Sequence, residues 1–292
     1  MNPSTDPTQT PDGGRPASGA ATDPGTAPTT PPVLYDLKAG IATITLNRPR
    51  AANALDLATK EALRDAVLAA ADDESVRCVI LTGAGEQAFC AGQDLREHAV
   101  NLREMTPEEI WSTIPNHYVP IARGLATMPK PVVAAVNGVA AGAGAALAFA
   151  CDFRVLADTA GFNLAFTAAG LSCDTGTSWT LPRLVGHAKA VDLLMRPRTV
   201  GAEEAERIGL ATSVVPAADL AEEAGKLARQ LADGPTAAFA GVRLSLAYAA
   251  SNSLEEALTF EGEMMRLCGQ TDDHINAVEA FLAKRRPSFE GH

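Results

Sequence analysis

The 292-residue sequence predicts an α/β fold. Short β-branched runs alternate with stretches whose apolar residues repeat at helical spacing, which is the order expected of βαβ units with parallel strands. Two of these runs, 78–83 and 132–136, lead into turns of small residues and then into helices. After Thr199 the pattern becomes helical. The sequence therefore predicts a mixed core followed by a helical region.

The individual elements follow from the spacing of apolar residues. Alternating or continuous apolar runs predict strands, and a period near 3.6 predicts helices. In the core, strands are expected at 41–46, 78–83, 132–136 and 153–156. Helices are expected at 57–71, 106–128 and 142–150. Amphipathic helices are expected at 201–209, 217–232, 235–250, 253–268 and 273–285.

The first 32 residues differ from the rest of the chain. They are rich in Pro, Thr, Gly and Ala and contain no apolar run before Val33, which predicts a disordered tail. The segment lacks the basic and apolar regions of a secretory signal and the Arg-rich character of a transit peptide, so we expect a cytoplasmic protein. The domains expected are the tail at 1–32, a core at 33–198 and a helical region at 199–292.

Composition narrows the classes of partner. A net charge of −11 argues against nucleic acid and anionic membrane surfaces. The five cysteines show no Cys-x-x-Cys spacing, and no two of the five histidines share a helical spacing. We therefore expect reduced thiols, no metal site and no resident cofactor.

The segment 130–152 is the most informative part of the chain. Its length would suit a transmembrane helix, but Pro131 and the Asn-Gly pair at 137–138 divide it into a strand, a turn and a helix. The helix opens on Gly-Ala-Gly at 142–144. Small residues there expose unpaired N–H groups, and the helix dipole favours negative charge. The segment predicts either a tightly packed core without chemistry or a backbone site for a developing oxyanion.

A second segment has the same order of elements. The strand at 78–83 is followed by Phe-Cys-Ala-Gly-Gln-Asp-Leu at 89–95. With Asn-Arg-Pro at 47–49 and Asn-Ala-Leu-Asp at 53–56, these segments resemble the enoyl-CoA hydratase/isomerase, or crotonase, superfamily. The resemblance spans about residues 33–292. It implies a crotonase-like superhelical spiral of ββα turns followed by a helical trimerisation region.

The resemblance also implies the partners. These are an acyl-CoA thioester, with coenzyme A as part of the substrate, and further copies of the chain in a homotrimer or hexamer. Because coenzyme A is polyanionic and this chain is acidic, local basic residues are needed, and Arg50 and Lys284 are the candidates. In the superfamily, an ending like that at 281–289 borders the phosphate and adenine of coenzyme A, often across a subunit boundary.

The site implied by the resemblance is built largely from backbone. The N–H groups of Gln93 and Ala143 would hold the thioester oxygen in an oxyanion hole. Other residues at the family's substrate- or CoA-binding positions surround these two donors. They are Arg50, Ala52, Ala91, Gly92, Asp94, Leu95, Gly142, Phe166, Phe281 and Lys284.

The acidic residues distinguish between activities of the superfamily. Hydratases use two glutamates, whose positions are occupied here by Ala146 and Phe166, and neither residue can transfer a proton. Asp174 falls where several isomerases of the superfamily carry a catalytic Asp. The motif at 89–95 and the ending at 280–285 most resemble 1,2-epoxyphenylacetyl-CoA isomerases. We expect apolar neighbours, Phe166, Leu171 and Trp179, to raise the pKa of Asp174.

The sequence therefore predicts an acyl-CoA isomerase that moves a double bond or opens a ring epoxide through a thioester enolate. Enoyl-CoA hydration is the alternative. A 4-chlorobenzoyl-CoA dehalogenase-like activity is a minor alternative, which would require a Trp at Phe166 and a His such as His117. A non-catalytic acyl-CoA-binding protein is the other minor alternative, because both hydratase glutamates are absent and an Asp before Thr-Gly is commonly a helix N-cap.

Overall fold

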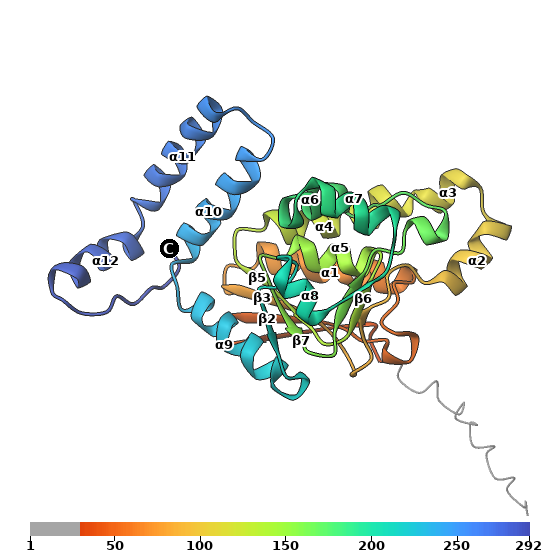
Figure 1. Cartoon of the computed structure of the whole chain (residues 1–292). Helices are drawn as coiled ribbons and strands as arrows, with labels where there is room; N and C mark the ends of the chain where they lie inside the picture. Colours follow the sequence, from red (N-terminus) through yellow and green to blue (C-terminus); the bar gives the residue numbers. More distant parts are fainter. Residues whose placement is uncertain (1–29) are drawn as a thin grey trace, which may run out of the picture. The chain divides into compact units, whose positions relative to one another are not determined.

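The computed structural model describes residues 30–292, and two β-sheets form the centre of this part of the chain (Figure 1). Residues 1–29 of the predicted tail lie outside the described residues. The larger sheet has the order β1 (Val33–Lys38), β2 (Ile41–Leu46), β3 (Cys78–Gly83), β5 (Val132–Val136), β7 (Phe153–Ala157) and β10 (Ser213–Val215). The smaller sheet has the order β4 (Ala88–Cys90), β6 (Val139–Ala141), β8 (Gly161–Asn163) and β9 (Thr199–Gly201).

Strand pairing confirms the α/β class. Within the larger sheet β2, β3, β5, β7 and β10 pair in parallel, and only β1 pairs antiparallel with its neighbour β2. Each of β3, β5 and β7 is followed by a short strand of the smaller sheet and then by helical segments. This repeat of two strands and a helix is the ββα spiral that the resemblance implied.

Most helices lie where the apolar spacing predicted them. Those before residue 200 are α1 (Leu57–Asp72), α2 (Leu95–Glu104), α3 (Pro107–Trp111), α4 (Val119–Thr127), α5 (Ala143–Ala150), α6 (Thr177–Val185) and α7 (His187–Met195), with 3-10 turns η1 (Pro49–Ala51) and η3 (Thr167–Ala169). A π-helical turn, η2 (Ile114–Tyr118), precedes α4. The later ones are α8 (Ala202–Arg207), the 3-10 turn η4 (Ala217–Asp219), α9 (Leu220–Ala232), α10 (Thr236–Ala249), α11 (Leu254–Cys268) and α12 (Asp272–Leu282). However, α6 and α7 were not predicted, and the expected helical region at 106–128 is divided into α3, η2 and α4.

The segment 130–152 is divided as the sequence predicted. β5 is buried along its whole length, β6 follows a short turn, and every residue of α5 is buried. Among residues 30–292, no helix combines the length and the apolar character needed to cross a bilayer. Small side chains let α5 approach β4 closely: a Cβ atom added to Gly144 would lie 2.2 Å from the Cys90 carbonyl oxygen. This contact brings the two predicted site segments together.

The region after Thr199 is less purely helical than the sequence predicts. The short strands β9 and β10 lie there and complete the two sheets, and α9 packs against β3, β5 and β7. Three-residue strands have too few positions to show a period of two, which is why their pattern could not be read. Helices α10 to α12 extend beyond the sheets (Figure 1).

Arg243 connects the extended helices to the core. Its Nε donates to Asp152 Oδ1 at 2.8 Å. Its Nη atoms donate to three backbone carbonyls, those of Leu125, Met128 and Lys130. Because the side chain is buried, these bonds replace water around the charge and fix α10 against the end of α4.

Candidate functional site

The two motifs predicted as a backbone site meet at the carboxyl ends of β4 and β6 in the smaller sheet. β4 and β6 pair in parallel, so the turns that follow them lie side by side. A Cβ atom added to Gly92 would lie 2.7 Å from the Ala141 carbonyl oxygen and 3.2 Å from the Ala143 nitrogen. Gly92 has a φ of +81° and Gly142 a φ of +50°. Only glycine meets both the close approach and these backbone angles without strain.

The backbone N–H groups of Gln93 and Ala143 at these turns donate to no group within residues 30–292. Main-chain bonds to Leu55 hold the backbone on both sides of the Gln93 N–H. Leu55 N–H donates to the Gly92 carbonyl at 2.8 Å, and Asp94 N–H donates to the Leu55 carbonyl at 3.1 Å. Ala143 is the first residue of α5, whose dipole favours an acceptor at that end. These groups are available to a negatively charged oxygen.

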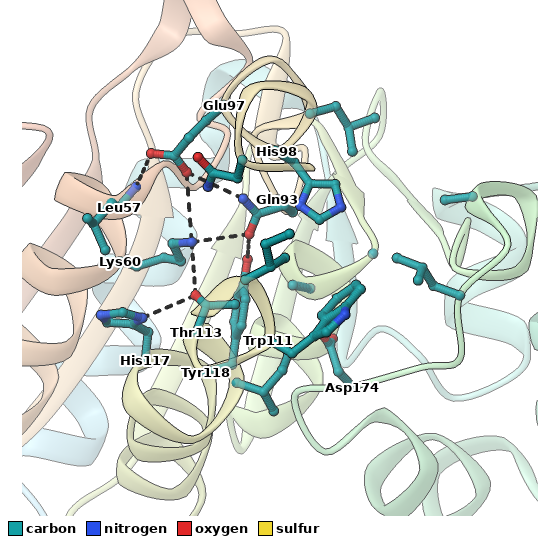
Figure 2. Close-up of a pocket in the computed structure, with 18 of the residues that line it drawn as sticks. Leu57, Lys60, Gln93, Glu97, His98, Trp111, Thr113, His117, Tyr118 and Asp174 are labelled. Atoms are coloured by element: carbon teal, nitrogen blue, oxygen red, sulfur yellow. Dashed lines mark hydrogen bonds and ion pairs between the residues drawn. The ribbon is translucent and has the colours of Figure 1, made fainter. Parts of the chain in front are cut away.

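A cavity of about 370 Å³ adjoins the two turns (Figure 2). Its floor includes residues of both turns, and its other walls come from α1, α2, α3, η2 and the loop before α6. The lining is mainly apolar. It consists of Leu57, Lys60, Ala91, Gln93, Leu95, Glu97, His98, Asn101, Met105, Glu109, Ile110, Trp111, Ser112, Thr113, Ile114, His117, Tyr118, Ala141, Gly142, Ala143, Ala165, Phe166, Ala169, Leu171 and Asp174.

Asp174 contributes a carboxyl group to this cavity. Thr175 Oγ1 donates to its Oδ1 at 2.9 Å. Burial raises the pKa of Asp174, and the bond from Thr175 opposes that shift. The residue is not a helix cap: α6 begins after Gly176, no side chain caps it, and Asp174 offers that helix only its backbone carbonyl. The N-cap interpretation of Asp174 is therefore wrong.

The apolar wall around Asp174 differs in one member from the predicted wall. Phe166 and Leu171 line the cavity as expected, but Trp179 does not. Its ring is covered by the Arg183 guanidinium, whose Cζ lies 4.3 Å from the ring centroid. Trp111, from α3, lines the cavity instead (Figure 2).

A buried lysine lies on the opposite wall. Lys60 Nζ donates to Thr113 Oγ1 at 2.9 Å and to Gln93 Oε1 at 3.3 Å, and it lies 3.9 Å from Glu97 Oε2. Burial lowers the pKa of Lys60, and the charge of Glu97 opposes this shift. Sequence reasoning missed this residue, although Lys60 lies in phase with the buried Leu63 on one face of α1.

Tyr118 and His117 belong to the same cluster of polar side chains as Lys60, Gln93 and Thr113. Tyr118 Oη donates to Gln93 Oε1 at 2.7 Å, and Thr113 Oγ1 lies 3.1 Å from His117 Nδ1. Burial raises the pKa of Tyr118, and the charge of Asp174 adds to the effect. Burial lowers the pKa of His117, and the charge of Lys60 lowers it further, so the neutral imidazole is favoured.

The remaining predicted residues divide into neighbours of the cavity and residues outside it. Leu95, Ala91 and Gly142 line it. The Ala52 carbonyl accepts from Ala91 N–H at 3.0 Å, which places Ala52 directly behind the lining. Asp94 caps α2 and pairs with Arg48 Nη1 at 3.0 Å, so its carboxylate is engaged in the scaffold.

Three predicted CoA-binding residues lie away from the cavity of the single chain. Arg50 is exposed in η1. Phe281 is 81% exposed near the end of α12, and Lys284 follows that helix with a φ of +54°. Neither hydratase position supplies an acid: Ala146 is buried outside the lining, and Phe166 presents a ring to it.

Comparison with known proteins agrees with this geometry. Residues 36–292 match the family described as enoyl-CoA hydratase/isomerase. A 1,2-epoxyphenylacetyl-CoA isomerase of Escherichia coli K12 is 39% identical over 259 residues, covering 89% of this chain and 98% of the relative. A crotonyl-CoA hydratase of Syntrophomonas wolfei is 37% identical over 261 residues, covering 88% of this chain and 97% of the relative.

A solved structure extends the comparison to three dimensions. The crystal structure of an enoyl-CoA hydratase from Bacillus anthracis has a TM-score of 0.84 and 33% identity, covering 89% of this chain and 100% of that chain. Fold and site together thus define a protein with the crotonase fold. The chain belongs to the enoyl-CoA hydratase/isomerase family, which confirms the resemblance inferred from its two motifs.

Proposed function

We propose that this protein is an acyl-CoA isomerase in which Asp174 transfers the proton and the N–H groups of Gln93 and Ala143 stabilise the thioester enolate. The observation that carries the proposal is the presence of a buried carboxyl group in the cavity that adjoins two unpaired N–H groups. The similarity to the isomerase of Escherichia coli supports it.

In the proposed cycle, the Asp174 carboxylate removes a proton from a carbon that the thioester activates. The electrons of the C–H bond move toward the thioester oxygen, where the two N–H groups stabilise the charge. The protonated carboxyl group then returns the proton to a different carbon, which shifts the double bond. The same thioester activation suits the opening of a ring epoxide.

Hydration is the second candidate, and the relatives that are hydratases favour it. Two other carboxylates line the cavity, but both have partners. Glu97 accepts from Leu57 N–H at 2.9 Å and pairs with Lys60, while Glu109 closes a capping box with Thr106. Neither is placed as one of a pair that orients water, so we favour isomerisation.

The two minor alternatives have less support. A dehalogenase would need an indole donor beside Asp174 at the position of Phe166, and a phenyl ring donates no hydrogen bond. His117 lines the cavity but is tied to Thr113. The case for a binding protein without activity had two grounds, the absence of both hydratase glutamates and a capping role for Asp174, and the second is removed because Gly176 is the N-cap of α6.

The experiment that tests the proposal compares two reactions of the wild-type protein. Double-bond migration in a 3-enoyl-CoA is measured beside hydration of crotonyl-CoA at equal enzyme concentration. An isomerase gives fast migration, exchanges substrate protons with deuterated water and hydrates slowly. Fast hydration without migration would contradict the proposal, and the absence of both reactions and of exchange would favour the binding protein.

The pH dependence of isomerisation should follow Asp174. Burial raises its pKa above the ordinary value of about 3.9. Because only the carboxylate can accept a proton, kcat/KM is expected to fall as the pH falls through this raised pKa. The measurement is a pH–rate profile, with acetyl-CoA affinity recorded over the same range as the control. A rate that stays constant down to the ordinary range of Asp would contradict the assignment.

We also propose that the protein is a trimer or a dimer of trimers. Apolar side chains on α10 to α12 are largely exposed in the single chain, including Leu246, Leu254, Met265, Phe281 and Leu282. A neighbouring copy would cover these side chains. Phe281 and Lys284 of one copy would then reach the cavity of the neighbouring copy. Light scattering of the full chain and of one starting at Val33 should give the same number of chains per particle, three or six. A stable, active monomer would contradict the proposal.

A further inference from the structure

Lys60 and Tyr118 converge on one acceptor, the side-chain carbonyl of Gln93 (Figure 2). Tyr118 donates to Gln93 Oε1 at 2.7 Å and Lys60 at 3.3 Å. The donors come from α1 and η2, which are far apart in the sequence. Lys60 is 3% exposed and Tyr118 is 2% exposed. Water therefore does not compete for these bonds, which makes them stronger than their exposed counterparts.

The location of Gln93 gives these bonds a functional consequence. Its own N–H is one of the two proposed oxyanion donors, and it follows Gly92, which restricts the backbone little. The side-chain carbonyl is the part of Gln93 that two buried donors hold. Stabilisation of an oxyanion depends on donors that are aimed before charge develops. Leu55 N–H holds the Gly92–Gln93 peptide at its carbonyl oxygen, and an anchored Gln93 side chain restricts the same peptide further.

We propose that Lys60 and Tyr118 are positioning residues that orient the Gln93 N–H through the Gln93 side chain, an inference that rests on the proposed function. Neither residue has to touch the substrate or exchange a proton. The Lys60 ammonium is itself held by Thr113 at 2.9 Å and by Glu97 at 3.9 Å. The polar side chains on this wall thus help to fix the orientation of one backbone donor, the Gln93 N–H.

Ligand binding provides the first test. Acetyl-CoA and its thioether analogue S-ethyl-CoA differ in the carbonyl oxygen, so the ratio of their affinities reports on the oxyanion hole. In Tyr118→Phe and in Lys60→Met, we expect the preference for acetyl-CoA to fall about tenfold, less than the loss of a whole donor. The affinity for S-ethyl-CoA should change less than about twofold. Tyr35→Phe and Lys38→Met make the same chemical changes on the exposed strand β1 and should leave the ratio unchanged.

A double-mutant cycle provides the second test. Gln93→Met removes the side-chain acceptor and keeps the backbone N–H. Adding Tyr118→Phe to Gln93→Met should therefore lower the affinity ratio of acetyl-CoA to S-ethyl-CoA by a further factor of less than about two. Independent, multiplicative losses would overturn the proposal, because they would mean that Tyr118 acts without Gln93. An unchanged ratio in the single variants would overturn it as well. If Lys60→Met does not fold, the cycle with Tyr118 decides alone.

These outcomes separate the inference from the proposed function. The affinity ratio needs no turnover, whereas the function is tested by isomerase activity and by its dependence on Asp174. A wild-type protein without isomerase activity whose affinity ratio follows the cycle would keep the positioning role and lose the function. An active isomerase whose ratio ignores Tyr118 and Lys60 would keep the function and lose the positioning role.

Discussion

Asp174→Asn should lower the rate of double-bond migration by at least about a hundredfold, the lower end of what general acid–base catalysis supplies. The amide has the size of the carboxyl group but cannot accept a proton. Because burial disfavours the charged form of Asp174, its removal should not lower the melting temperature. The measurement is kcat for a 3-enoyl-CoA together with acetyl-CoA affinity, which should persist.

A matched control for this change is Asp36→Asn, which alters an exposed carboxylate on β1. This variant should keep full activity. The assignment would be wrong if Asp174→Asn retained wild-type isomerase activity. It would also be wrong if the wild type hydrated crotonyl-CoA as a fast hydratase does, because the other two carboxylates of the cavity, Glu97 and Glu109, have partners of their own and are not expected to orient water with Asp174.

Gly142→Leu should abolish measurable acyl-CoA binding while the fold is retained. Gly142 has φ +50° and ψ −123°, a conformation that costs other residues about 1–3 kcal/mol. A Cβ atom here would lie 3.9 Å from Phe166 Cε1, so a leucine side chain would project into the cavity. Both effects act on the turn that presents the Ala143 N–H. Isothermal titration with acetyl-CoA measures the loss.

Gly186→Leu is the control for backbone strain alone. Gly186 has φ +78° and lies between α6 and α7, with open space around the position of a Cβ atom. This variant should lose stability to a similar extent and keep its affinity for acetyl-CoA. If Gly142→Leu bound acetyl-CoA as the wild type does, the turn would not be part of the binding site.

The sequence was sufficient for the long elements and for the two turns. The strand at 78–83 is a short apolar run, and α1 repeats apolar residues at helical spacing because one of its faces is buried. Every residue of α5 is buried, and its start was recognised from the Gly-Ala-Gly sequence. The short strands β4, β6, β8, β9 and β10 have only three residues each and depend on the sheet for their pairing. The sequence could not predict them.

The walls of the cavity were harder to predict than its floor. Trp111 and Tyr118 reach the site through α3 and η2, whose placement depends on tertiary packing and not on a local pattern. Trp179 was expected there because it follows Asp174 closely, but its position on α6 directs it to Arg183. Lys60 is different: a lysine in phase with buried residues of a helix was a visible anomaly.

The closeness of α5 to β4 at Gly144 has a consequence for how such proteins diverge. Main-chain packing sets the distance between the Gln93 and Ala143 nitrogens, so an exchange of side chains can adjust the orientation of a donor but not this distance. Variation in activity must arise from the groups around them. Whole-chain identity mostly records the shared scaffold, which is why an isomerase at 39% and a hydratase at 37% are nearly equidistant. The residues that determine the activity are then expected among the few that line the cavity walls.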